Sequence, residues 1–286
     1  MEIKASLRGI APQTLYLLLF LVVLGSGYAF SEFISTPVVD IPFVITETGQ
    51  AVTFSMSLGK ILEIIAWSFG LILAGYLLIE RNLAIWEGQG MVSVRKKDLI
   101  FHLFIIAGIM IATGNILHVY FNTLNGMVED FAETSFEGWT IFVLVYDIDE
   151  QVSHGLIHVG ILLLIAMLLA AEPVNIQGDL TSKIAKNTMF TMLLGFVMGA
   201  VQAFAALEGQ AGILVLLGSW TIMLMVLVVH FRAGQRGFDT LRLFERPNLG
   251  FFACFIIAAT ITIIVWGLIF GFVPAYPFFK QPGDVF

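Results

Sequence analysis

The chain has 286 residues, of which 58% are hydrophobic and only 12% are charged, and its formal net charge is −7. With a mean hydropathy of +0.94, this composition excludes a water-soluble globular protein and predicts an integral, multi-pass membrane protein. The negative net charge argues against a nucleic-acid partner. The single cysteine, Cys254, excludes an intrachain disulfide and a cysteine-based metal site.

Seven apolar segments follow one another along the chain, each long enough to cross a hydrocarbon core about 30 Å thick. We expect transmembrane helices at about 13–31, 54–79, 98–121, 151–171, 187–207, 210–230 and 250–274, with the fourth helix extended outward from about residue 139. The predicted fold is therefore an all-α, polytopic bundle of seven helices. We expect it to form a single transmembrane domain over residues 1–286, with the lipid bilayer as its surroundings.

Lysine and arginine collect in alternate connecting segments, which predicts the orientation of the bundle. They occur in the N-terminal segment and in the connections 80–97, 172–186 and 231–249, whereas acids dominate the other connections. Because basic residues remain on the cytoplasmic side of short loops, we expect the N-terminus inside and the C-terminus outside. The expected location is the cell membrane of a prokaryote.

Acids and histidines crowd into one stretch, DIDEQVSHGLIH, at residues 147–158. In an α-helix, Asp147, Glu150, Gln151, His154 and His158 share one face, whereas Asp149 points away from it. Ionisable groups inside a membrane helix are costly, and they usually face the bundle interior and serve function. This polar stripe is the candidate site, and the expected orientation places it in the outer leaflet.

The third predicted helix offers a matching face, because Asn115, His118 and Asn122 are spaced by three and four residues. Consecutive helices usually pack as neighbours, so we expect His118 to approach the histidines of the fourth helix. Lys60 and Glu63, three residues apart at a similar depth, can form an internal ion pair. The residues expected to support the site or to contact the substrate are Asn115, Asn122, Ser153, Lys60, Glu63 and Gln202.

His118, His154 and His158 are the predicted metal ligands. Two histidines four residues apart on a helix and a third from its neighbour can bind one ion and leave a position open for water, as catalytic zinc sites do. We expect one transition-metal ion, with zinc favoured over copper. Glu150 and Asp147 are the expected catalytic residues, as a base for the metal-bound water, with a further ligand or a partner that fixes a histidine tautomer as the open alternatives. Two alternatives remain open, a satisfied hydrogen-bond network at the membrane surface and a proton or ion pathway.

Haem, retinal and nucleotide cofactors are not expected. His102 and His118 are 16 residues apart on one predicted helix, which rotates them by about 160° and prevents them from holding two stacked haems. The last predicted span has no lysine that could carry retinal.

The pattern Ser153-His154-x3-His158-Val159, with His118 on another helix of a seven-helix bundle, resembles the zinc hydrolase superfamily of alkaline ceramidases and adiponectin-type receptors. The resemblance implies that His118, His154 and His158 bind zinc. It also implies that an acid such as Asp147 or Glu150 works with the metal-bound water to cleave a lipid amide. In that family the histidine pair lies on the final helix and the bundle has the opposite orientation, whereas here the pair lies on the fourth helix.

The order of the first six spans resembles the C subunit of copper membrane monooxygenases, the particulate methane and ammonia enzymes. The similar pieces are Leu62-Glu63-Ile64, Gly75-Tyr76-Leu77, Arg81-Asn82-Leu83, His102-Leu103 and Asp147-x-Asp149-x3-Ser153-His154. In that family copper is held by a D-x3-H-x12-H motif. Its last histidine aligns with His154, its aspartate with Glu137 and its middle histidine with Ile141, so one ligand is replaced.

The sequence therefore predicts a membrane-embedded, metal-dependent enzyme with a site in the outer leaflet. The favoured reaction is zinc-type hydrolysis of a lipid or another hydrophobic small molecule, and the chain can act within a homo- or hetero-oligomer. One alternative is a subunit of a copper-dependent membrane monooxygenase complex. The other is a non-enzymatic transporter, ion pathway or accessory membrane subunit.

Overall fold

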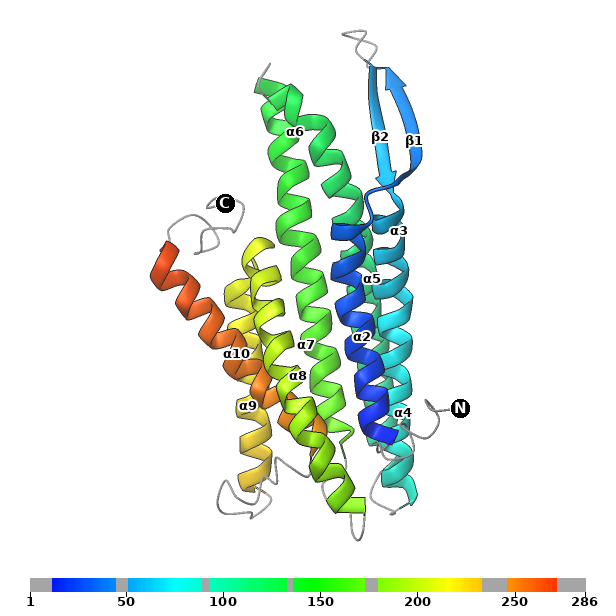
Figure 1. The fold of residues 1–286 in the computed structure, drawn as a ribbon, viewed down its shortest axis with the longest axis vertical. Helices are drawn as coiled ribbons and strands as arrows, with labels where there is room; N and C mark the ends of the chain where they lie inside the picture. The colour runs from blue at the N-terminus through cyan, green and yellow to red at the C-terminus, as the bar shows by residue number, and fades with distance from the viewer. Residues whose placement is uncertain are drawn as a thin grey trace.

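A computed structural model describes residues 12–44, 51–88, 93–132, 136–172, 180–232 and 246–271, which form a bundle of long helices (Figure 1). Two short segments, η1 and η2, are π-helical and continue the α-helices on either side of them. In chain order the elements are α2 (Pro12–Phe33), β1 (Pro37–Val44), β2 (Ala51–Ser57), α3 (Leu58–Ile65), η1 (Ala66–Leu71), α4 (Ile72–Gly88), α5 (Val94–Ala132), α6 (Phe136–Asp147), η2 (Ile148–Ser153), α7 (His154–Ala170), α8 (Leu180–Glu208), α9 (Gly212–Arg232) and α10 (Pro247–Phe270).

The apolar helices confirm an all-α membrane bundle. Within the described residues, six helical stretches are long and apolar enough to cross a membrane: Leu58–Ala84, Val94–Val128, Phe136–Ala170, Thr188–Leu207, Gly212–Val229 and Pro247–Phe270. The first expected span coincides with α2, whose apolar stretch is shorter, Leu17–Ser26. The fourth expected span is continuous with the segment that precedes it, since α6, η2 and α7 form one rod over Phe136–Ala170.

A β-hairpin precedes the second long helix, and the sequence analysis did not predict it. Strands β1 and β2 pair antiparallel, with Asp40 opposite Ser55. The second helix therefore begins at Leu58 rather than at about 54, and the Ser57 side chain caps it by accepting a hydrogen bond from the backbone N–H of Lys60 at 3.2 Å. Hydropathy alone missed the boundary, because the alternating apolar residues of β2 merge with the apolar run of α3.

Small residues let the site-bearing helices approach closely. A Cβ atom on Gly114 of α5 would lie 2.7 Å from the backbone O of Ser153 and 2.8 Å from the backbone N of Ile157. Gly160 of α7 faces Ile111 of α5 at a similarly short distance, 2.7 Å to its Cγ1. Backbones that meet at small residues are typical of membrane helix pairs. This contact sets the level of α5 relative to η2, one turn from His118.

Helices α8 and α10 form a second close pair. Gly195 and Gly199, four residues apart, each face a backbone carbonyl of α10, since an added Cβ would lie 2.2 Å from the O atoms of Phe251 and Phe255 respectively. Such small-xxx-small patterns allow close helix crossings in membranes. The pair supports the wall of the bundle that faces α7.

Glu172, two residues beyond the end of α7, caps the N-terminus of α10. Its Oε1 accepts a hydrogen bond from the backbone N–H of Asn248 at 2.6 Å, and its Oε2 accepts one from Leu249 at 3.1 Å. The Nε atom of Arg246 lies 3.4 Å from Oε2. Burial raises the pKa of Glu172 to about 7, although Arg246 and the two N–H groups lower it.

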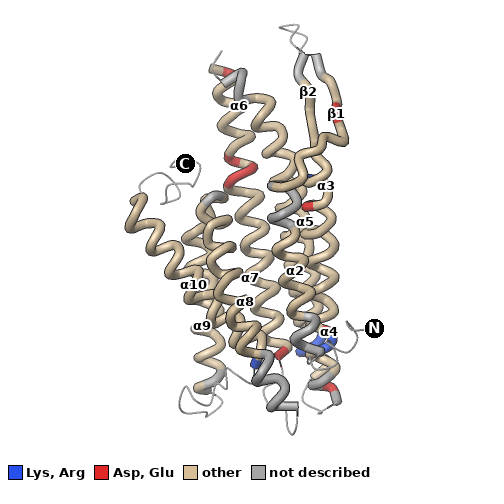
Figure 2. Tube along the Cα trace, viewed as in Figure 1, with Lys and Arg blue, Asp and Glu red and all other residues tan. Residues whose placement is uncertain are grey.

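Most of the lysines and arginines drawn lie toward one end of the bundle, whereas acidic residues lie in both halves (Figure 2). Arg81, Arg95, Lys96 and Lys97 lie where α4 ends and α5 begins. The acids of the 147–150 stretch lie in the other half, toward the β-hairpin.

Candidate metal centre

His118 of α5, Asp149 of η2 and His154 of α7 converge on one point. The His118 Nδ1 atom lies 2.8 Å from Asp149 Oδ1 and 3.1 Å from His154 Nε2. The two imidazole rings meet edge to face, with their centroids 4.4 Å apart. The ligand atoms of the three residues all lie within 4.8 Å of one another. As expected, His118 lies against the fourth membrane helix.

The prediction that Asp149 points away from this face is wrong. An α-helix would rotate Asp149 about 140° away from His154. The structure has a π-helix here, whose hydrogen bonds run from residue i to i+5 and which therefore brings residues five apart toward one face. Ser153 Oγ also donates to the backbone carbonyl of Asp149. Asp149 is 1% exposed, so the widened turn buries its carboxylate against His118.

One signal in the sequence could have identified Asp149. Three acids occur within four residues, Asp147 to Glu150, at the start of an apolar run. An α-helix at this depth must leave one of them facing lipid, which is costly. A wider turn gives the helix a broader inward face, so this crowding of acids is itself an indication of an irregular helix.

His158 does not join the three convergent atoms. Its ring centroid lies 6.0 Å from that of His154, one helical turn further along α7. Its Nδ1 atom lies 2.7 Å from Nε2 of Gln202 on α8. His158 is 2% exposed, and its Nε2 atom has no hydrogen-bond partner among the described residues.

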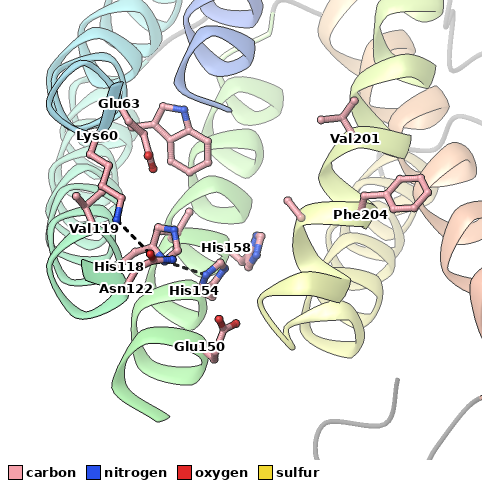
Figure 3. Close-up of a pocket in the computed structure, with 13 residues that line it drawn as sticks. Lys60, Glu63, His118, Val119, Asn122, Glu150, His154, His158, Val201 and Phe204 are labelled. Atoms are coloured by element: carbon pink, nitrogen blue, oxygen red, sulfur yellow. Dashed lines mark hydrogen bonds between the residues drawn. The ribbon is translucent and has the colours of Figure 1, made fainter. Parts of the chain in front are cut away.

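A cavity of about 430 Å³ lies beside these residues, between the helices that carry the histidines and α8 (Figure 3). Figure 3 shows Glu150, His154 and His158 directed from one rod toward the space that α8 faces. Lys60 and Glu63 line the cavity from α3. Its apolar lining includes Trp67 of η1 and, from α8, Val201 and Phe204.

Several predicted supporting residues hold the framework of the site. Lys60 Nζ donates to Asn122 Oδ1 at 3.2 Å and to Thr123 Oγ1 at 3.0 Å, which ties α3 to α5. Asn115 is fully buried, and its Nδ2 atom donates to the backbone carbonyl of Glu63 at 3.4 Å. The Lys60–Glu63 ion pair stays a prediction.

The two predicted catalytic acids differ in position. Glu150 lines the cavity. Asp147 accepts a hydrogen bond from Gln151 Nε2 at 3.3 Å and is not among the described residues that line the cavity. Of these two acids, Glu150 is the one that lines the space in which a substrate could lie.

The turn between α8 and α9 covers His154, which the sequence analysis did not foresee. A Cβ atom on Gly209 would lie 1.8 Å from His154 Nδ1, so only a glycine fits against the ring. The next residue, Gln210, has a positive φ of 49°, and its Nε2 atom donates to the Tyr146 hydroxyl at 2.9 Å. With Nδ1 against this turn, His154 presents Nε2 to His118.

Comparison of the chain with protein-family models, with curated protein sequences and with solved structures gave no match. The resemblances to zinc hydrolases and to copper monooxygenase subunits therefore stay predictions.

Proposed function

We propose that this protein is a membrane-embedded metalloenzyme whose ion is bound by His118, Asp149 and His154, and that it hydrolyses a lipid or another hydrophobic small molecule. The observation that carries the proposal is the convergence of two imidazole nitrogens and one carboxylate oxygen within 4.8 Å of one another, beside a cavity of about 430 Å³. The proposal replaces His158 by Asp149 in the ligand set expected from the sequence.

The distances suit a small transition-metal ion. Bonds of about 2.0–2.1 Å at tetrahedral angles hold two ligand atoms about 3.3 Å apart. The two closest pairs of ligand atoms, His118 with Asp149 and His118 with His154, lie 2.8 and 3.1 Å apart. Each distance would therefore have to increase by about 0.5 Å or less to admit an ion. Ligands must be deprotonated to bind a metal, and the ion would take the place of the protons that these atoms share.

The charge of the site also favours a divalent cation. Three carboxylates, Asp149, Glu63 and Glu150, and one ammonium, Lys60, belong to the cluster and its cavity. In their ionised forms they leave an excess of two negative charges, which is expensive inside a membrane. One divalent ion neutralises this excess. Zinc remains favoured over copper, since two histidines and a carboxylate form a known catalytic zinc set with an open position.

The lining of the cavity supports a hydrophobic substrate. Val201 and Phe204 line it, and they are 39% and 47% exposed on the surface of a membrane-spanning helix. A molecule dissolved in the bilayer can therefore reach the cavity past α8. We further propose seven spans with the N-terminus inside, which puts the basic end of α4 and α5 at the cytoplasm and the site in the outer leaflet. The prokaryotic origin and the oligomeric state stay predictions.

Each residue has a role in this proposal. His118, Asp149 and His154 would hold the ion, which would supply a water of lowered pKa as the nucleophile. Glu150 lines the cavity, where it would take up a proton as the general base and return it to the leaving group as the general acid. Lys60 holds Asn122 and keeps α3 and α5 at a fixed spacing.

Metal content of the purified protein tests the proposal. We expect about one zinc ion per chain after removal of bound metal and reloading, and loss of most of it in His118→Ala, His154→Ala and Asp149→Asn. The matched control is Asp147→Asn, which removes a carboxylate from the same stretch but outside the cavity and should retain the ion. A wild-type chain that takes up no zinc, copper or iron would refute the metal centre and leave the hydrogen-bond network as the interpretation.

A second function is favoured by the same ligand set. Two histidines and one carboxylate with open positions also bind iron in oxygenases. Stoichiometric iron or copper in the native protein, together with partner subunits that purify with it, would favour oxidation over hydrolysis.

A further inference from the structure

His158 presents one polar atom to the cavity from a buried position. The side chain is 2% exposed and lines the cavity, and its Nε2 atom has no hydrogen-bond partner among the described residues. Leaving a buried polar nitrogen without a partner is unfavourable. An atom of this kind, in the wall of a cavity, indicates a ligand that completes its hydrogen bond.

Gln202 determines which form of the imidazole faces the cavity. Its Nε2 amide lies 2.7 Å from His158 Nδ1, and an amide N–H can only donate. His158 Nδ1 is therefore the acceptor, and the proton of the neutral ring is on Nε2. A protonated Nε2 cannot bind a metal ion, but it can donate a hydrogen bond to an oxygen atom.

The surroundings of His158 define the chemistry of its ligand. His154 and the metal centre lie one helical turn away, with the two ring centroids 6.0 Å apart. Beside its charged groups, the cavity lining includes the apolar side chains of Ile157 and Val201, which are neighbours in the chain of His158 and Gln202. A hydrogen-bond donor in an apolar wall suits an uncharged oxygen acceptor attached to a hydrocarbon chain.

We propose that His158, oriented by Gln202, is a hydrogen-bond donor to the substrate and is not a metal ligand. Its Nε2–H group holds a carbonyl or hydroxyl oxygen of an amphiphile whose hydrocarbon chain lies along the apolar wall. That this amphiphile is a substrate rests on the function proposed above. Its binding to His158 does not require the metal ion. The site gives the enzyme selectivity for amphiphiles that carry an oxygen acceptor at this depth.

Nitrogen NMR of the five histidines, recorded with and without zinc, tests whether His158 is a metal ligand. We expect the proton of His158 on Nε2 in both spectra, while zinc shifts the ring nitrogens of His118 and His154. A zinc-induced shift of His158 Nε2 makes it a ligand and overturns the proposal. If zinc shifts no histidine, the metal centre fails, and the second measurement decides on His158 independently.

That measurement is the binding of octanamide to the metal-free protein. Loss of one neutral hydrogen bond should weaken binding about 3- to 10-fold in His158→Phe. Gln202→Glu should have a similar effect, since a carboxylate accepts the Nδ1 proton and leaves Nε2 without one. His102→Ala, which removes a histidine of α5 that is not among those lining the cavity, is the control and should bind as the wild type does. Unchanged affinity in His158→Phe, or no binding by the wild type, overturns the proposal.

Discussion

Gly209→Ala is the substitution that most directly tests how His154 is positioned. The added methyl group would lie 1.8 Å from Nδ1, 2.3 Å from Cγ and 2.6 Å from Cε1 of the imidazole. Non-bonded heavy atoms prefer about 3.5 Å or more, so the ring or the turn must move by about 1.7 Å. Metal–ligand distances tolerate about 0.2 Å. We therefore expect metal affinity to fall by about 100-fold, the upper end of what supporting residues contribute.

A competition titration with a chelator, on protein in detergent, measures this loss. The control is Gly155→Ala, next to His154 on the same helix, where an added Cβ meets nothing within 4 Å. In a double-mutant cycle, Gly209→Ala should add little to the effect of His154→Ala, because it acts through that ring. A folded Gly209→Ala variant that binds zinc within about threefold of the wild type would show that His154 is not held by this turn.

Two further predictions concern the α10 contacts. Because the folded chain raises the pKa of Glu172 from 4.5 to about 7, its contribution to the free energy of unfolding is fully present below pH 4.5 and is lost as the pH rises through about 7, a loss of about 3 kcal/mol. Glu172→Gln should remove this component from the pH profile of thermal unfolding, whereas substitution of the exposed Glu87 by Gln should not. Parallel profiles of the wild type and Glu172→Gln would contradict the assignment. Gly199→Ala places a Cβ 2.2 Å from the Phe255 carbonyl oxygen and should lower the free energy of unfolding by about 1–3 kcal/mol. The control is Gly126→Ala, whose added Cβ meets nothing within 4 Å. Equal stability of the two variants would argue against the close crossing of α8 and α10.

The sequence predicted the parts of this protein that follow from hydropathy and regular helix geometry. Long apolar runs identify the helices because the bilayer core requires them. The approach of His118 to His154 followed from their common depth and from the packing of consecutive helices. Both arguments need only the average geometry of an α-helix, which the structure retains over most of α5 and α7.

The rest depended on local departures from that geometry. The inward position of Asp149 requires the π-helical turn, and no hydrophobic period indicates where a helix widens. Gly209 acts through a turn between α8 and α9, and its contact with His154 joins residues far apart in the chain. Gln202, the polar partner of His158, was expected at a similar depth. Its effect on the position of the imidazole proton depends on which ring nitrogen the Gln202 amide contacts, and here that nitrogen is Nδ1.

Both π-helical segments flank α5 at the level of the cavity, and two adjacent residues of α5 accommodate them. Asn115 donates its amide to the Glu63 carbonyl, just before η1, while Gly114 leaves room for the Ser153 carbonyl at the end of η2. Irregular backbone is tolerated within a membrane only where protein or a polar cavity surrounds it, and π-helical turns are frequent at functional sites. The two widened turns bring Trp67, Asp149 and Glu150 to the cluster and its cavity. The two widened turns therefore mark the same level of the bundle as the histidines, and they do so through the backbone alone.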